Sequence, residues 1–104
     1  MHSTMNLGGS VVSKNILEKR GRVKWCFREE SVNNIDNGWR FLSEIDTDEF
    51  LADSKNMVIC DWGTIFEIEP AIAPIFELPI GTELTLEYDL SLIHISEPTR
   101  HSLI

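Results

Sequence analysis

The stretch Val23-Lys-Trp-Cys-Phe-Arg-Glu29 has the most regular pattern in the sequence. Large apolar side chains at every second position alternate with Lys24, Cys26 and Arg28. A period of two is typical of a β-strand with one face toward a core. We expect Val23, Trp25 and Phe27 to point into the core and the residues between them to point the other way. This strand decides the fold because neighbouring segments must pair with it.

The segment that follows predicts a hairpin. Residues 31–38 are rich in turn-forming side chains and end in Asn37-Gly38, the strongest turn dipeptide in the chain. Trp39–Ser43 then has the composition of a returning strand. We therefore expect residues 23–43 to form two antiparallel strands joined by a long loop.

Shorter segments on both sides complete the expected fold. Further strands are expected over 10–13, 57–60 and 82–88, and short helices over 14–20, 48–52, from 62 onward and over 71–78. Ser13, Thr47 or Asp46, and Asp61 stand where helix caps belong. These elements predict an α+β domain with a small, mostly antiparallel sheet of four to five strands and two or three short helices.

The expected core combines the hairpin with the apolar run Met57–Cys60, which is typical of a buried central strand. Trp39 follows a glycine and is the best candidate for a half-exposed ring, although we expect it in the core. Both cysteines are expected to be buried thiols, because no spacing typical of a zinc site is present. The centre of the core is predicted to hold Val23, Trp25, Phe27, Trp39, Phe41, Val58 and Ile59.

A length of 104 residues predicts one domain, which we place at residues 1–89. Residues 90–100 resemble a translated sequencing-library adapter, so residues 90–104 are expected to be a non-native tail. The alternative is an amphipathic strand over 90–95 that Pro98 ends. The sequence has no apolar run long enough to span a membrane and no secretory signal at Met1–Met5.

Charge is unevenly distributed along the chain. The formal net charge is −8, yet residues 1–28 hold six basic side chains and one acid, whereas residues 44–89 hold twelve acids and one base. An acidic surface repels phosphate, so nucleic-acid binding is disfavoured. The acids form either a face for a basic partner or an ordinary solvated surface, and the basic first segment is expected to fold against the acidic second one.

Catalytic chemistry finds little support in these residues. The three histidines are His2 at the N-terminus and His94 and His101 in the suspect tail, which excludes histidine-based nucleophilic catalysis. Carboxylates cluster in Glu44-Ile-Asp-Thr-Asp-Glu49. The calcium-loop pattern nevertheless fails: with Asp46 as the first position of the loop, the fifth position is Phe50 and no glycine follows it. Helix capping by Asp46 or Thr47 explains part of this cluster.

Four motifs resemble one bacterial family. They are the block Gly38-Trp-Arg-Phe-Leu-Ser-Glu-Ile-Asp-Thr-Asp-Glu-Phe-Leu51, then Asn56-Met-Val-Ile-Cys-Asp61, Ile68-Glu-Pro70 and Pro79-Ile-Gly81. Val12-Ser13 and Phe27-Arg-Glu-Glu30 add to the likeness, which runs from about Gly9 to Gly81. The chain resembles the immunity protein thirty-three-like family, first catalogued as a domain of unknown function.

This resemblance implies an α+β fold, no cofactor, no enzymatic activity and a cytoplasmic role in neutralising a protein toxin. A basic nuclease toxin fits an acidic inhibitor, which gains association rate from complementary charge. Direct contact with nucleic acid or membrane is not expected. The segment 44–53 carries five acids and no base directly after a strand, so we expect the partner to bind Glu44, Asp46, Asp48, Glu49 and Asp53.

Two alternatives remain open at this point. One is an interaction or regulatory module whose partner is not a toxin. The other is a metal-dependent hydrolase that uses Asp46, Asp48 and Glu49. The identity of the neighbouring gene discriminates the first from an immunity protein, and calorimetry with divalent metal ions discriminates the second.

Overall fold

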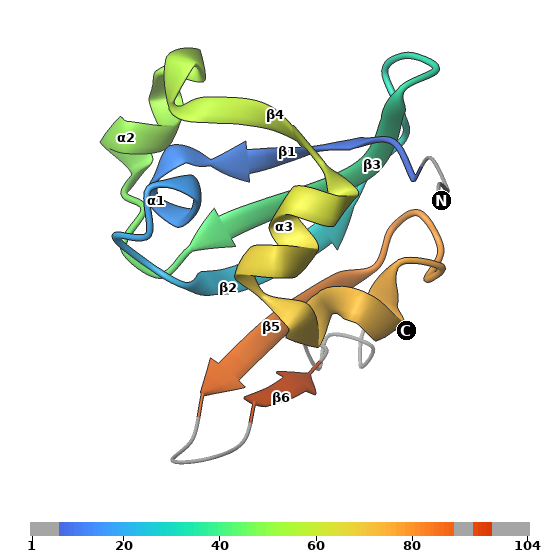
Figure 1. Cartoon of the computed structure of the whole chain (residues 1–104). Helices are drawn as coiled ribbons and strands as arrows, with labels where there is room; N and C mark the ends of the chain where they lie inside the picture. Colours follow the sequence, from blue (N-terminus) through green and yellow to red (C-terminus); the bar gives the residue numbers. More distant parts are fainter. Residues whose placement is uncertain (1–6, 89–92, 97–104) are drawn as a thin grey trace, which may run out of the picture.

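A twisted mixed sheet forms the body of the computed structural model, which describes residues 7–88 and 93–96 (Figure 1). Six strands run in the spatial order β4-β1-β3-β2-β5-β6. Strands β1 and β3 are parallel, and every other neighbouring pair is antiparallel. The strands are β1 (Gly9–Ser13), β2 (Val23–Arg28), β3 (Asp36–Ser43), β4 (Met57–Asp61), β5 (Glu83–Tyr88) and β6 (Ile93–Ser96).

Short helices connect these strands. The α-helices are α1 (Lys14–Leu17), α2 (Asp48–Ala52) and α3 (Trp62–Ile68), and two 3₁₀ helices are η1 (Ser54–Asn56) and η2 (Pro70–Ile75). Helices α1, α3 and η2 lie over one face of the sheet, whereas α2 lies beyond its end (Figure 1). The α+β class and the mostly antiparallel sheet are confirmed. The described residues form one strand more than the four to five expected.

The core lies between the sheet and α3. Trp39 and Phe41 of β3 are completely buried and meet Trp62 of α3, with the Phe41 and Trp62 ring centroids 5.8 Å apart. Phe76 packs edge-on against Trp62 at 4.7 Å, and its carbonyl accepts a 3.1 Å hydrogen bond from Trp39 Nε1. The prediction that Trp39 is a core residue is confirmed. The buried apolar side chains are Val12, Ile16, Val23, Cys26, Trp39, Phe41, Trp62, Ile65, Ile72, Ile75, Leu84 and Leu86.

The hairpin of β2 and β3 is confirmed, but the inward face of β2 was wrongly predicted. Val23 pairs with Ser43 and Trp25 with Leu42, so the register shifts by one residue between them. Such a bulge turns the following side chains to the opposite face. Cys26 is therefore buried, while Trp25 is 41% exposed and Phe27 is only half-buried.

The predicted turn at Asn37-Gly38 is wrong, because both residues belong to β3. The loop instead closes through side chains: the Asn33 amide oxygen accepts from the backbone N–H groups of Ile35 and Asp36. Gly38 keeps its special role, since its φ is +89° and a side chain there would collide with the carbonyl of Glu29. The glycine is therefore needed for close strand approach inside the hairpin.

The prediction that Met57–Cys60 is a buried central strand is also wrong. Strand β4 is the edge of the sheet and pairs with β1 alone. Val58 is half-buried and Ile59 is 72% exposed, because β4 has one strand neighbour and its outer face has no helix over it. An apolar run alone does not distinguish an edge strand from a central one.

Two of the predicted helix caps are confirmed, whereas Asp61 stands at the N-cap position of α3 without a side-chain cap hydrogen bond. Thr47 Oγ1 accepts from the Phe50 N–H at 3.0 Å at the start of α2, and Ser13 Oγ accepts from the Asn15 N–H at the start of α1. Helix α1 is shorter than the expected 14–20 and ends at Leu17. Of the segment 90–104, only β6 is described, and it pairs antiparallel with β5.

Candidate functional site

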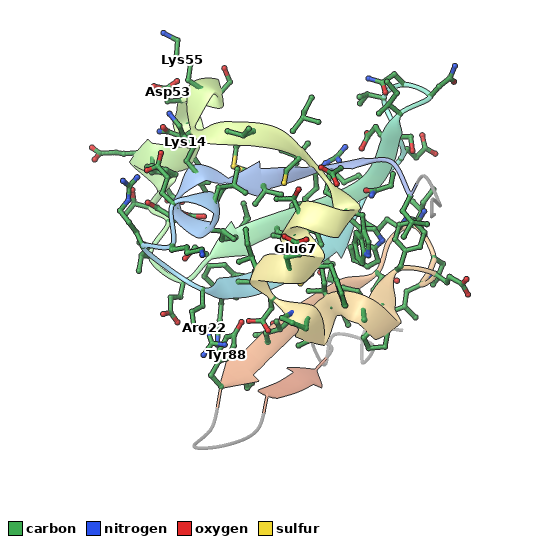
Figure 2. All side chains as sticks on the ribbon, viewed as in Figure 1. Lys14, Arg22, Asp53, Lys55, Glu67 and Tyr88 are labelled. Atoms are coloured by element: carbon green, nitrogen blue, oxygen red, sulfur yellow. The ribbon has the colours of Figure 1, made fainter. Side chains whose placement is uncertain are left out.

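The acidic segment 44–53 links the end of β3 to the beginning of β4 and contains α2. It therefore lies at one end of the sheet, with Asp53 labelled near Lys55 just beyond α2 (Figure 2). Four of its five acids, Glu44, Asp48, Glu49 and Asp53, are exposed. The structure thus presents four of the predicted partner-binding carboxylates to solvent.

Asp46 has an internal role. Its carboxylate accepts hydrogen bonds from Ser13 Oγ at 2.8 Å, Asn15 Nδ2 at 2.7 Å and the Ser43 N–H at 2.8 Å. Ser13, Asn15 and Ser43 are buried, so this carboxylate satisfies polar groups at the junction of β1, α1 and β3. We conclude that Asp46 positions the acidic segment.

The other acids of the segment lie at helix ends or line a surface hollow. Asp48 and Glu49 lie in the first turn of α2, where the helix dipole favours negative charge. Asp53 accepts from the Lys55 N–H at 2.9 Å and so caps η1, a role that the sequence analysis missed. Glu44 lines a polar hollow of about 400 Å³ together with Arg20.

A second charged cluster lies at the start of β2, around the same hollow that Glu44 lines. Glu69 is 4% exposed and accepts from Arg22 at 3.2 Å, while the Tyr88 hydroxyl lies 3.0 Å from the same carboxylate oxygen. The Arg22 guanidinium stacks on the Tyr88 ring, 3.7 Å from its centroid, and Figure 2 shows the two side chains together. Burial and the Glu69 charge raise the pKa of Tyr88, which remains a neutral phenol at pH 7. This cluster ties β2, η2 and β5 together.

A third cluster centres on Arg40 of β3. Its guanidinium makes two hydrogen bonds to Asp36, at 2.9 and 3.0 Å, and one to Glu29 at 2.8 Å. The Arg40 hydrogen bonds, together with those from the Val32 and Gly38 N–H groups, hold the pKa of Asp36 well below its usual range despite burial. The pKa of Arg40 is raised in turn. Both groups are charged at any physiological pH.

Cys26 and Cys60 are both free thiols. Burial, reinforced by Glu69, raises the pKa of the Cys26 thiol to about 12, so it is an inert core group. Cys60 is half-buried rather than buried as expected. No group of three or more His, Cys, Asp or Glu side chains gathers as a metal site within residues 7–88 and 93–96. Among those residues, no helix combines the length and hydropathy that crossing a membrane requires.

Comparison with known families assigns the chain. The model of the immunity protein Imm33 domain matches residues 10–96, which include the whole described sheet except Gly9. The chain belongs to the Imm33 family. No curated protein and no solved structure matches it.

The motifs that carried the resemblance explain how this Imm33 domain is built. In Gly38-Trp-Arg-Phe41, Trp39 and Phe41 enter the core and Arg40 centres the third cluster. Arg28 reaches across the hairpin end, where its guanidinium donates to the backbone carbonyls of Asn37, Phe76 and Leu78. Trp39, Phe41 and Arg28 therefore hold the fold together.

Proposed function

We propose that this Imm33 domain is an immunity protein that binds a protein toxin and neutralises it. Membership of the family carries the proposal. The protein acts by binding rather than by catalysis, in the cytoplasm of the cell that it protects. Direct contact with nucleic acid or membrane has no part in this role.

The exposed carboxylates of segment 44–53 are proposed as the surface that attracts the toxin. Glu44, Asp48, Glu49 and Asp53 concentrate negative charge at one end of a rigid sheet, and Asp46 anchors the segment from inside. A toxin that cuts nucleic acid needs a basic groove for phosphate. An acidic surface seated over such a groove blocks the substrate and gains association rate from charge complementarity.

The test is a protection experiment with the toxin domain encoded beside the gene for this chain. A bacterial host expresses the toxin domain alone, with the wild-type chain, or with Phe41→Asp, which places a charge in the core and serves as an unfolded control. We expect growth only with the wild-type chain, and a stable complex of the two purified proteins. Growth arrest in all three cultures, with no complex, would contradict the proposal and favour an interaction module with another partner.

A further inference from the structure

The face of the sheet opposite α1 and α3 carries exposed apolar side chains. Strand pairing puts Val11 opposite Ile59 and Trp25 opposite Leu42, and Arg40 lies between Val11 and Phe27. Val32 and Ile35 of the 29–35 loop adjoin this face. We call this surface the open face; it consists of Val11, Trp25, Phe27, Val32, Ile35, Arg40, Leu42 and Ile59.

Exposure on the open face is far above that of a covered sheet. Ile59 is 72%, Ile35 68% and Val32 78% exposed, and Trp25 is 41% exposed. Four of the seven exposed large apolar side chains among the described residues therefore gather on one surface. Contiguous apolar surface of this kind marks an interaction site rather than a solvated one.

Two hollows shape the open face. One, of about 160 Å³, is lined by Gly9, Val11, Val32, Ile35 and Ile59. A side chain at Gly9 would begin 3.1 Å from Ile59 Cγ2 and 3.9 Å from Ile35 Cγ2, so the glycine leaves this hollow open. The other, of about 420 Å³, lies between β3, β2 and β5 and is lined by Trp25, Cys26, Phe27, Leu42, Glu83, Leu84 and Thr85.

Arg40 separates the two hollows and is held rigidly. Its side chain is 9% exposed and is fixed by Asp36, which is 7% exposed, and by Glu29, which is 56% exposed. Because one cation meets two carboxylates, the centre of the open face keeps a net negative charge. A partner group that approaches it finds a pre-organised acidic spot between two apolar hollows.

Charge indicates the occupant. The charged residues of the open face and its margin are Lys24, Glu29, Asp36, Arg40, Glu83 and Glu87, which leaves two negative charges in excess. A second copy of this chain would bring like charges together, and the whole chain carries −8. A basic protein surface with protruding apolar side chains is complementary to both features.

We propose that the open face is the docking surface for the toxin domain, a proposal that rests on the proposed function. The toxin inserts apolar side chains into the two hollows and sets basic side chains against Glu29, which is 56% exposed. Segment 44–53, which begins where β3 ends, accelerates the encounter, whereas the open face determines how long the complex lasts.

The kinetic test uses a catalytically inactive form of the toxin domain encoded beside the gene, immobilised as the probe. Trp25→Ser and Ile59→Ser remove apolar surface from the open face. Phe66→Ser and Ile80→Ser remove side chains of similar exposure, 40% and 56%, from α3 and from the turn before β5. We expect each open-face variant to dissociate at least tenfold faster at an unchanged association rate, and each control variant to stay within twofold of wild type.

A spectroscopic test does not depend on affinity. Trp25 is exposed, whereas Trp39 and Trp62 are 0% and 5% exposed. In the chain labelled with 5-fluorotryptophan, Trp25→Phe identifies the Trp25 resonance. Saturation with the unlabelled toxin domain is expected to shift that resonance most.

The outcomes separate the two proposals. If the wild-type chain neither binds the toxin domain nor protects against it, the proposed function is wrong, and so is the proposed docking surface. If the wild-type chain binds and protects, but Trp25→Ser and Ile59→Ser dissociate like wild type and the Trp25 resonance does not move, the open face is not the interface although the function stands. Faster dissociation of Phe66→Ser alone would move the interface to the helical face.

Discussion

Trp39 shows how much one residue contributes to this fold. Its ring is fully buried between the sheet and α3, and its indole N–H donates to the Phe76 carbonyl. Trp39→Ala leaves a large cavity and removes one of the two hydrogen bonds that the Phe76 carbonyl accepts, so we expect the free energy of unfolding to fall by about 3–5 kcal/mol. Urea titration followed by circular dichroism measures the change.

The matched control is Trp25→Ala, which truncates the same side chain where it is 41% exposed. We expect it to cost about 1 kcal/mol or less. A loss of under about 1 kcal/mol for Trp39→Ala would contradict the core role of that ring.

Asp36 makes stability depend on pH. The Arg40 hydrogen bonds lower the pKa of Asp36 in the folded protein below the value of about 3.9 in an unfolded chain. Its contribution is therefore complete above about pH 4 and is lost as the pH falls toward the folded pKa. We expect Asp36→Asn to cost about 1–3 kcal/mol at pH 7, because a charged hydrogen-bond partner is lost.

Melting temperatures of the wild-type chain and Asp36→Asn between pH 2 and pH 7 test this expectation. The difference between them should shrink below pH 4. Parallel curves across the whole range would show that the carboxylate charge of Asp36 contributes nothing to the fold.

At the scale of elements, sequence reasoning succeeded where the signal is local. Thr47 stands before two acids and predicts the start of α2, and the alternation of Leu84, Leu86 and Tyr88 predicts β5 and its buried face. It failed where the deciding interaction is distant. The bulge between Val23 and Trp25 depends on pairing with β3, and no local sequence pattern predicts it.

The same limit applies to the candidate site. Charge density located the segment 44–53, and the structure leaves Glu44 and its acidic neighbours exposed. The open face was not predicted, because Trp25 and Ile59 are residue types that are usually expected in a core. Their exposure follows from the strand order and pairing of the sheet. The hydrogen bonds to Asp46 come from Ser13 and Asn15, about thirty residues away along the chain.

The edge strand β6 provides the prediction at this scale. It has four residues and pairs with β5 alone, at the far edge of the sheet from β4. Because we expect residues 90–104 to be a foreign tail, deleting them should leave the melting temperature nearly unchanged. Calorimetry of the shortened chain measures this. A decrease well beyond the roughly 4–8 °C that corresponds to about 1 kcal/mol would show that the segment belongs to the fold.

At the scale of the whole molecule, folding brings the basic first segment against the acidic remainder. Arg22 pairs with Glu69, and Lys24 pairs with Glu87 across the β2–β5 edge. These contacts cancel charge around β2 and β5. The acids of segment 44–53 are left at one end of the sheet, where Lys55 and Lys14 are labelled near Asp53 (Figure 2) and Arg20 lines the same hollow as Glu44, so part of their charge remains uncompensated. Uncompensated charge in one place produces the field that steers a partner.

Reversal of that charge is the prediction for the whole molecule. Glu44→Lys combined with Asp53→Lys replaces two negative charges with two positive ones on the exposed segment. If a basic toxin domain is steered to this end of the sheet, the association rate should fall several-fold and depend less on salt. Stopped-flow mixing with the inactive toxin domain at two salt concentrations measures both quantities. Glu67→Lys with Glu77→Lys makes the same change in net charge outside segment 44–53. Because Glu67 lines the same hollow as Glu44, Glu77→Lys alone is the remote control.

The design accounts for the cap that Asp53 provides. Asp53→Lys removes the acceptor for the Lys55 N–H, whereas Asp53→Asn removes the charge and retains an acceptor. Glu44→Lys with Asp53→Asn should therefore give an intermediate association rate at wild-type stability. If both combinations associate like wild type with an unchanged salt dependence, segment 44–53 does not steer the toxin. A larger effect of Glu67→Lys with Glu77→Lys would place the steering surface around those two residues. Glu69, the third acid of that region, is buried against Arg22 and Tyr88 and is not available to steer a partner.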